Sequence, residues 1–224
     1  MSKGRHVYVT GGSGLIGKAI VTCFKEKKYK VTNIDRSEDA DFVVDLNIEY
    51  FKTEEFERFF EKIKKDDIWI NSLYPPLWTE HLVAYNILSE YAAEAMVSKG
   101  GGCIINMSSI YGIRGTYPHL YTDGAEIKEP SIEYCMVKGG INAMTKALAT
   151  RYGEYGVRAN TIIAGGVNDD HQERDMDFYE QYICRVPLFR MAEPEEIAHA
   201  ALFFAENSYV TGQELAIDGG YTAW

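Results

Sequence analysis

Thr10-Gly11-Gly12-Ser13-Gly14-Leu15-Ile16-Gly17 is the stretch that most constrains the fold of this 224-residue chain. An apolar run, Val7–Val9, precedes it and predicts a strand. Apolar residues at helical spacing follow it and predict a helix. Glycines at 11, 14 and 17 permit a sharp turn, a close backbone approach to a pyrophosphate and tight packing of the helix on a sheet. The free N–H groups of such a helix start attract phosphate. The pattern predicts a dinucleotide-binding turn, although an ordinary glycine-rich turn has the same composition.

The next expected strand ends in an acidic residue. Asp35 follows the run Tyr29–Ile34 and lies 18 residues after Gly17. A carboxylate there can accept hydrogen bonds from the ribose hydroxyls of an adenosine, and it would repel a 2′-phosphate. We therefore expect NAD as the cofactor and regard NADP as the less favoured alternative, since Arg36 is able to bind that phosphate. The other role open to Asp35 is a solvated strand end.

Strands and amphipathic helices alternate throughout, with no repeat, low-complexity segment or linker in the sequence. This pattern predicts an α/β fold with a doubly wound (Rossmann) parallel sheet of seven strands, helices on both faces and a single domain over residues 1–224. The expected strands are Val7–Thr10, Lys30–Ile34, Phe42–Asp45, Ile68–Ile70, Cys103–Met107, Arg158–Ile163 and Glu214–Ile217. The expected helices beyond the first are Ile48–Lys65, His81–Val97, Ile132–Tyr155 and Pro194–Phe204.

Ligands of such sheets bind at the carboxyl ends of the strands. The candidate residues all follow expected strands: the glycine turn, Asp35, Asp45, Asn71, Ser109 and the loop after Ile163. Their common location supports a single binding site more strongly than any one motif does.

Tyr134 and Lys138 lie four residues apart in a helical segment, so their side chains share one helix face. A phenol has an ordinary pKa of about 10, which is too high for acid-base work near neutrality. An ammonium one turn away favours the phenolate and lowers that pKa. A solvated helix face would show the same two residues, so the pair gains meaning only from the glycine turn in the same chain.

Charge, hydropathy and cysteine spacing indicate which kinds of partner the chain is not expected to bind. The formal net charge is −10, and no basic patch with interleaved aromatic residues is present, so nucleic acid is not expected. No apolar run reaches membrane-spanning length, and the N-terminus runs directly into a strand without room for a signal peptide. The four cysteines lack C-x-x-C spacing, which indicates reduced thiols, a cytoplasmic location and no metal site. The acidic stretch Asp169–Glu173 is expected to be a solvated loop rather than a metal site.

With these residues identified, the chain resembles the short-chain dehydrogenase/reductase family over nearly its whole length. The residues that carry the resemblance are the glycine turn at 10–17, Asp35, Asp45-Leu46, Ile105–Ser109, Tyr134–Lys138, Arg158-Ala159-Asn160, Arg185–Ala198, Thr211-Gly212-Gln213 and Asp218-Gly219-Gly220.

The resemblance implies an enzyme that transfers hydride between a nicotinamide and a secondary alcohol or ketone. It implies that Tyr134 is the catalytic acid/base, that Lys138 lowers its pKa and binds the nicotinamide ribose, and that Ser109, rather than Ser108, holds the substrate oxygen. The cofactor-binding residues that it implies, beside Tyr134 and Lys138, are Gly11, Ser13, Gly14, Leu15, Ile16, Asp35, Asp45, Leu46, Asn71, Gly165 and Val167.

Three departures from the family pattern concern the site. Asn71-Ser72-Leu73-Tyr74 replaces the usual Asn-Asn-Ala-Gly, which leaves Asn71 a structural or an adenine-side role and puts Tyr74 at the cofactor-facing glycine. His81 occupies the position of the family's catalytic asparagine. The glycine spacing resembles that of the sugar-nucleotide branch.

The segment between Ser109 and Tyr134 is longer than usual, with 24 intervening residues. It is aromatic and polar, and we expect the inserted loop at about 110–133 to form part of the substrate pocket. Tyr74, His81, Tyr111 and Tyr121 are the candidate substrate contacts. The alternative is a surface excursion that packs only on itself. The pattern resembles the branch linked to flagellin and surface-sugar modification, which implies a sugar or nucleotide-sugar substrate.

Two other functions remain open from the sequence. The altered residues at 71–74 and 81 suit a catalytically impaired dinucleotide-binding relative, and the glycine spacing suits a sugar epimerase or dehydratase with tightly bound NAD. The resemblance also implies a homo-oligomer, a tetramer or dimer, formed through the helices near 81–97 and 132–155 and the C-terminal strand.

Overall fold

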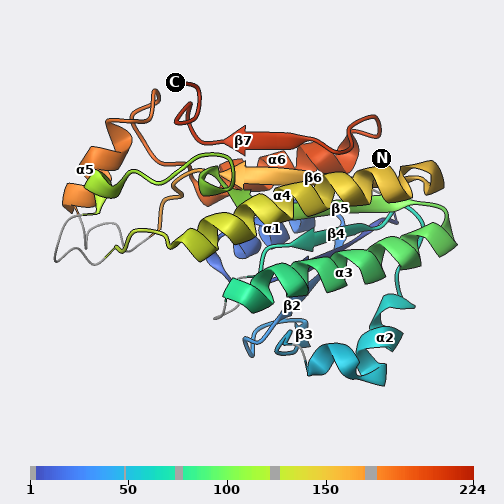
Figure 1. Ribbon diagram of the computed structural model, residues 1–224. Coiled ribbons are helices and arrows are strands. Elements are labelled where there is room, and N and C mark those ends of the chain that lie inside the picture. The colour runs from blue at the N-terminus through green and yellow to red at the C-terminus, as the bar shows by residue number, and fades with distance from the viewer. Residues whose placement is uncertain (1–3, 48, 74–77, 122–126, 170–175) are drawn as a thin grey trace.

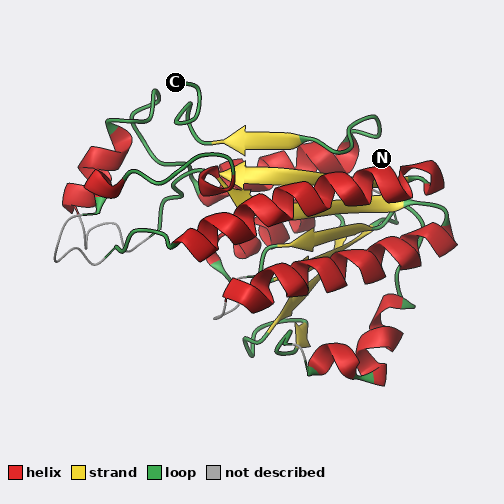
Figure 2. Cartoon of the chain, in the orientation of Figure 1, coloured by secondary structure: helices red, strands yellow, loops and turns green. Residues whose placement is uncertain are grey.

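One parallel sheet forms the centre of the molecule (Figures 1 and 2). The computed structural model describes residues 4–47, 49–73, 78–121, 127–169 and 176–224. Within these ranges the sheet has seven strands in the order β3-β2-β1-β4-β5-β6-β7. The predicted α/β class, parallel pairing and strand number are confirmed. The strands are β1 (His6–Thr10), β2 (Lys30–Asp35), β3 (Phe42–Val43), β4 (Ile68–Asn71), β5 (Gly102–Ser109), β6 (Val157–Ala164) and β7 (Glu214–Ile217).

Helices cover both faces of the sheet, which explains why every residue of β5 is buried. The helices are α1 (Leu15–Glu26), α2 (Glu54–Phe60), α3 (Trp78–Lys99), α4 (Ile132–Tyr152), α5 (Met176–Ile183) and α6 (Pro194–Glu206). One apolar core, which includes Trp69 and Tyr85, lies on the side of α2, α3 and α4. A second, which includes Ile20 and Phe204, lies on the side of α1 and α6.

Two predicted elements need correction, and one helix was not predicted. The expected helix Ile48–Lys65 is a 3₁₀ turn at Tyr50–Lys52 followed by the short α2. Thr53 separates them because its backbone is extended and its side chain accepts a hydrogen bond from Phe56 N, which starts a new helix. β3 ends at Val43, before Asp45. Helix α5 lies in a stretch to which the sequence analysis assigned no element.

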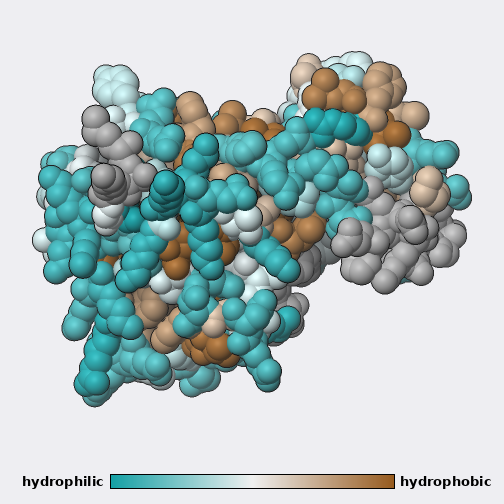
Figure 3. Space-filling model, turned by 180° about the vertical axis from the view of Figure 1, so that it is seen from behind, coloured by the Kyte–Doolittle hydropathy of each residue, from teal (hydrophilic) through white to brown (hydrophobic). Residues whose placement is uncertain are grey.

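The surface reflects the chain's composition. On the face that carries α1 and α6 most side chains are hydrophilic, and apolar ones gather toward the end of the molecule where α5 lies (Figure 3). Large exposed apolar side chains of this region include Met176, Leu188 and Phe189.

Candidate active site

The glycine turn connects β1 to α1 as predicted. Gly11 has a positive φ of 70°, and a Cβ there would lie 2.5 Å from Ser72 O, so the segment after β4 can approach this closely only beside a glycine. Gly11 N donates to Ile34 O at 2.9 Å. Helix α1 begins after Gly14 without a side-chain cap and without an acidic residue in its first turn. This uncapped helix start suits an anionic phosphate.

Asp35 at the end of β2 contacts the same turn. Its carboxylate accepts hydrogen bonds from Ser13 N at 3.1 Å and from Ser37 N at 3.1 Å. Ser13 Oγ donates to Asp39 at 2.9 Å and accepts from Asn33 Nδ2 at 2.9 Å. The acidic residue and the phosphate-type turn are therefore adjacent, which is the arrangement a dinucleotide requires on its adenosine side.

Asn71 has a structural role rather than a ligand-binding one. Its side chain is fully buried. Oδ1 accepts from Trp69 Nε1 at 2.8 Å and from Thr10 Oγ1 at 3.1 Å. Nδ2 donates to Ser89 Oγ at 3.0 Å and to Asn106 Oδ1 at 2.9 Å. The side chain thus joins β1, β4, β5 and α3, which agrees with a structural role, and a contact between Asn71 and the cofactor stays a prediction.

Tyr134 and Lys138 share one face of α4, as their spacing predicts. Ser131 caps the helix by accepting from Tyr134 N at 3.2 Å. The Lys138 ammonium lies 5.7 Å from the centre of the Tyr134 ring and donates to Met107 O at 3.4 Å. Lys138 is only 5% exposed, and this burial lowers its pKa to about 8. The ammonium is thus held beside the phenol in a largely water-free position.

The structure distinguishes the two serines at the end of β5. Ser108 Oγ donates to Lys138 O at 3.0 Å, so its hydrogen is used to attach β5 to α4. Ser109 Oγ accepts from Tyr111 N at 3.2 Å and donates to no group among the described residues. Ser109 therefore keeps a hydroxyl hydrogen that no described residue accepts, and its contact with a substrate oxygen stays a prediction.

Two aromatic residues of α3, Tyr85 and His81, lie near the Lys138 ammonium. The Tyr85 ring centre is 5.8 Å from Lys138 Nζ, and its hydroxyl donates to Asn71 O at 3.0 Å. The His81 ring packs on Tyr85 with 5.0 Å between centres. His81 is fully buried, and burial, reinforced by the Lys138 charge, lowers its pKa to about 3. It is neutral at physiological pH and packs on Tyr85, which contacts Lys138, and its role as a substrate contact stays a prediction.

The rings of Tyr85 and Tyr134 face the Lys138 ammonium, so a change in either ring should change the pKa of Lys138. We expect Tyr85→Leu to lower the Lys138 pKa from about 8 by about one further unit, because a desolvated cation–π contact contributes about 2 kcal/mol and each pKa unit is about 1.4 kcal/mol. Tyr85→Phe keeps the ring and should preserve most of that contact. NMR titration of ¹⁵N-labelled lysine side chains measures both. Equal midpoints in Tyr85→Leu and the wild type would contradict this role.

The inserted segment 110–133 packs against distant parts of the chain. Leu120 and Tyr111 join a small apolar cluster with Phe178 and Tyr182 of α5. Arg114 donates to Tyr221 O at 2.7 Å, and its guanidinium lies over that ring. The alternative that the insertion packs only on itself is therefore wrong.

Tyr111 and Tyr121 connect this cluster to Tyr134. Their hydroxyls are 2.8 Å apart. The Tyr111 ring is edge-on to Tyr134, with 6.5 Å between centres. Of the predicted substrate contacts, Tyr111 is thus the one placed directly beside Tyr134, whereas Tyr74 lies outside the described residues.

The remaining predicted cofactor residues flank the carboxyl edge of the sheet. Asp45 is exposed and accepts from Asn47 Nδ2 at 3.0 Å, and Leu46 packs against the α2–α4 core. Gly165 N donates to Ile217 O, and a Cβ at Gly165 would lie 2.8 Å from Asp218 Cα. Val167 forms an isolated parallel bridge with Ala192. Leu15 and Ile16 begin α1.

The described residues show neither a metal-ligand cluster nor a membrane-spanning helix. Among the described residues, no group of three or more His, Cys, Asp or Glu side chains is arranged to hold a metal ion. Residues 170–173 of the acidic stretch, with His171, lie outside those ranges. In the part of the chain that the structure describes, no helix is both long and apolar enough to span a bilayer.

A dinucleotide-type turn, a tyrosine–lysine pair and a serine at one edge of a parallel sheet define a nicotinamide-dependent oxidoreductase. A model for the family described as enoyl-(acyl carrier protein) reductase matches residues 81–222. Carbonyl reductase family member 4 of Xenopus laevis is 30% identical over 95% of this chain and 95% of that protein. Galactitol 2-dehydrogenase (L-tagatose-forming) of Cereibacter sphaeroides is 38% identical over 58% of this chain, a match that spans 49% of that protein.

A solved structure supports the same assignment. A short-chain dehydrogenase from Leptospira borgpetersenii serovar Hardjo-bovis with bound NAD⁺ is 30% identical, has a TM-score of 0.79 and covers 97% of this chain and 92% of its own. The chain belongs to the short-chain dehydrogenase/reductase family. It is an NAD(P)-dependent oxidoreductase that acts on alcohols or ketones.

Proposed function

We propose that the chain is an NAD-dependent dehydrogenase/reductase of a hydroxylated, sugar-like substrate, with Tyr134, Lys138 and Ser109 as its catalytic residues. The observation that carries this proposal is the buried ammonium of Lys138 at 5.7 Å from the Tyr134 ring, with the hydroxyl hydrogen of Ser109 left for a ligand. Bound NAD⁺ supplies the hydride acceptor. The residues that would hold it are those of the glycine turn, Asp35, Tyr134 and Lys138.

The protein's own part in the reaction is proton transfer and orientation. Ser109 donates a hydrogen bond to the substrate oxygen. Tyr134 as phenolate takes the hydroxyl proton when a carbinol is oxidised and returns it when a ketone is reduced. Lys138 stabilises the phenolate because its positive charge lies close by in a site of low dielectric.

A polyol or sugar is the substrate class we favour. Tyr111, whose ring is edge-on to Tyr134, has its hydroxyl paired with that of Tyr121, and the galactitol dehydrogenase is among the relatives. The glycine spacing and the insertion also support the sugar-linked branch of the family. The test measures nicotinamide reduction with a panel of polyols, sugars and nucleotide-sugars. NAD that raises the melting temperature without turnover would instead favour an impaired relative. NAD that co-purifies without net reduction would favour an epimerase or dehydratase.

Cofactor preference depends on Asp35. We expect Asp35→Ser to raise the ratio of kcat/KM with NADP to that with NAD by about 100-fold, because a like-charge contact with the 2′-phosphate costs several kcal/mol and Arg36 remains. Steady-state kinetics with both cofactors measures the ratio. Asp39→Ser removes another carboxylate that contacts the glycine turn, where it accepts from Ser13 Oγ, and should leave the ratio near wild type. Equal ratios in both variants would contradict this role of Asp35.

We also propose that the chain forms a homo-oligomer through α3 and α4. These helices pack side by side, and Ile132 and Met136 on α4 are 77% and 68% exposed. Burial of such apolar side chains in a symmetric interface stabilises an assembly. Light scattering on the purified protein should give a mass above the 25.3 kDa of one chain. Met136→Glu should lower that mass, and a monomer in the wild type would refute the proposal.

A further inference from the structure

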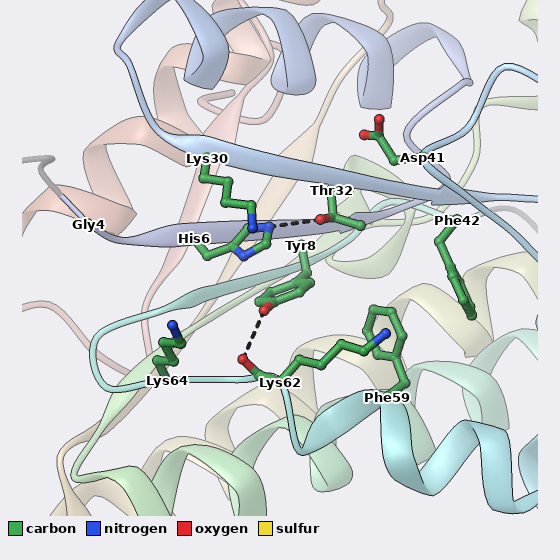
Figure 4. Close-up of a pocket in the computed structure, with 10 residues that line it drawn as sticks. All are labelled: Gly4, His6, Tyr8, Lys30, Thr32, Asp41, Phe42, Phe59, Lys62 and Lys64. Atoms are coloured by element: carbon green, nitrogen blue, oxygen red, sulfur yellow. Dashed lines mark hydrogen bonds between the residues drawn. The ribbon is translucent and has the colours of Figure 1, made fainter.

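A hollow of about 530 Å³ opens beside β1, β2 and α2 (Figure 4). It is bordered by the first halves of β1 and β2, by Phe42 at the start of β3, and by α2 with the segment that follows it. His6 and Lys30 lie at the amino-terminal ends of β1 and β2, whereas Asp41 and Phe42 lie beside Asn33 and Ile34 toward the carboxyl end of β2. None of the residues that line the hollow is among those assigned above to the dinucleotide or to catalysis.

Positive charge dominates the lining. Lys30, Lys62 and Lys64 line the hollow, and none of them has a carboxylate within 4.0 Å among the residues that the structure describes. The acidic lining residue, Asp41, accepts from Asn33 N at 2.9 Å. Behind the wall, both oxygens of Asp67 accept from backbone N–H groups. A cluster of unpaired ammonium groups on a chain of net charge −10 is a local attraction for anions.

Aromatic rings form the rest of the wall. His6 and Tyr8 stack with 4.2 Å between ring centres and 24° between planes. His6 Nε2 is 2.7 Å from Thr32 Oγ1, and the Tyr8 hydroxyl donates to Lys62 O at 3.3 Å, so both rings are held in place. The Lys62 ammonium lies 5.1 Å from the centre of the Phe59 ring. Figure 4 shows Lys30 and Lys64 on either side of His6.

We propose that this hollow binds a flat aromatic anion, an aryl phosphate or aryl carboxylate. The ring would lie against His6, which is itself stacked on Tyr8, a residue only 2% exposed. The anionic group would lie between the ammonium groups of Lys30 and Lys64. Aromatic faces offer apolar contact and stacking, and the lysines supply charge at the end of the ring. This inference is independent of the oxidoreductase chemistry, because the hollow shares no lining residue with the proposed catalytic site.

Isothermal titration calorimetry with phenyl phosphate tests the proposal. Saturating NAD⁺ is present in every titration to keep the dinucleotide site occupied. Anisole serves as the neutral ring, and inorganic phosphate as the anion without a ring. We expect phenyl phosphate to bind at least about tenfold more tightly than either, since charge and ring surface each contribute about 1.4 kcal/mol or more. Equal affinity for anisole would refute the role of the lysines, and equal affinity for inorganic phosphate would refute the role of the rings.

Variants locate the binding. Lys30→Ala/Lys64→Ala should weaken phenyl phosphate binding at least about tenfold. Lys25→Ala/Lys99→Ala removes the same charge from exposed helix ends and should leave the affinity unchanged. Thr32→Phe fills the hollow while it keeps all lysines, and it should abolish binding with the melting temperature as a check on folding. Wild-type affinity in the Lys30/Lys64 variant or in Thr32→Phe overturns the proposal. These experiments measure binding and not turnover. The affinities can therefore be interpreted even if the proposed oxidoreductase function is wrong.

Discussion

Tyr134→Phe is expected to lower kcat/KM by about 1,000-fold or more, while NAD binding and the melting temperature remain close to wild type. Proton transfer by a positioned side chain contributes about 10²- to 10⁴-fold, and the phenol hydroxyl is the group that makes this transfer in the proposed mechanism. The substitution keeps the aromatic ring, so the contact with the Lys138 ammonium at 5.7 Å is retained and the helix is not disturbed.

The measurement is steady-state turnover with the best substrate of the panel, together with NAD titration by calorimetry. Tyr155→Phe is the matched control, because it removes the hydroxyl of an exposed tyrosine beyond the far end of α4. We expect wild-type kinetics from it. A rate within tenfold of wild type in Tyr134→Phe would remove the phenol from the mechanism and leave Ser109 with Lys138 to be tested alone.

Asn71→Leu is expected to lower the free energy of unfolding by about 4 kcal/mol, although the two side chains have the same branched arrangement of non-hydrogen atoms. The amide makes four hydrogen bonds in a fully buried position, and its loss leaves Trp69 Nε1 and Asn106 Oδ1 each without one partner. Each buried polar group left unsatisfied costs about 1–3 kcal/mol. The effect therefore places Asn71 among the exceptional single substitutions.

Urea denaturation measures this free energy, and Asn86→Ala provides the comparison. Asn86 lies on α3 as a half-buried residue whose Nδ2 donates to Glu90 at 3.2 Å. Its replacement should cost less than about 1 kcal/mol, as most near-surface changes do. If Asn71→Leu also costs less than that, neighbouring side chains repair the network, and the residue's structural role is smaller than its hydrogen bonds indicate.

Much of the fold follows from local pattern. Short β-branched runs alternate with amphipathic segments, and each of the seven predicted strands overlaps the strand found in the structure. Prediction failed where a local interaction outweighed periodicity. The apolar face of 48–65 is buried as expected, yet Thr53 caps a new helix at Glu54 and breaks the predicted one in two. Helix α5 packs on the inserted segment, a contact that periodicity does not show.

The candidate site also has one part that local spacing predicts and another that depends on tertiary contacts. The four-residue spacing of Tyr134 and Lys138 places them on one helix face wherever that helix lies. The choice between Ser108 and Ser109 rested on resemblance alone, and it acquires a physical reason only when Ser108 is seen to donate to Lys138 O. Tyr85 shows no catalytic pattern in the sequence, and His81 is singled out there only by its place in the family pattern. Their contact with Lys138 and with each other is visible only because α3 packs against α4.

The sequence by itself determined the class of sheet, the phosphate-type turn and the tyrosine–lysine pair, because each depends on residues within a few positions of one another. Only the tertiary structure decided that the Asn71 side chain joins strands, that His81 is buried and neutral, and that a basic aromatic hollow lies beside β1, β2 and α2. These properties depend on which distant segments remove a side chain from water and supply its hydrogen-bond partners, and no local spacing contains that information.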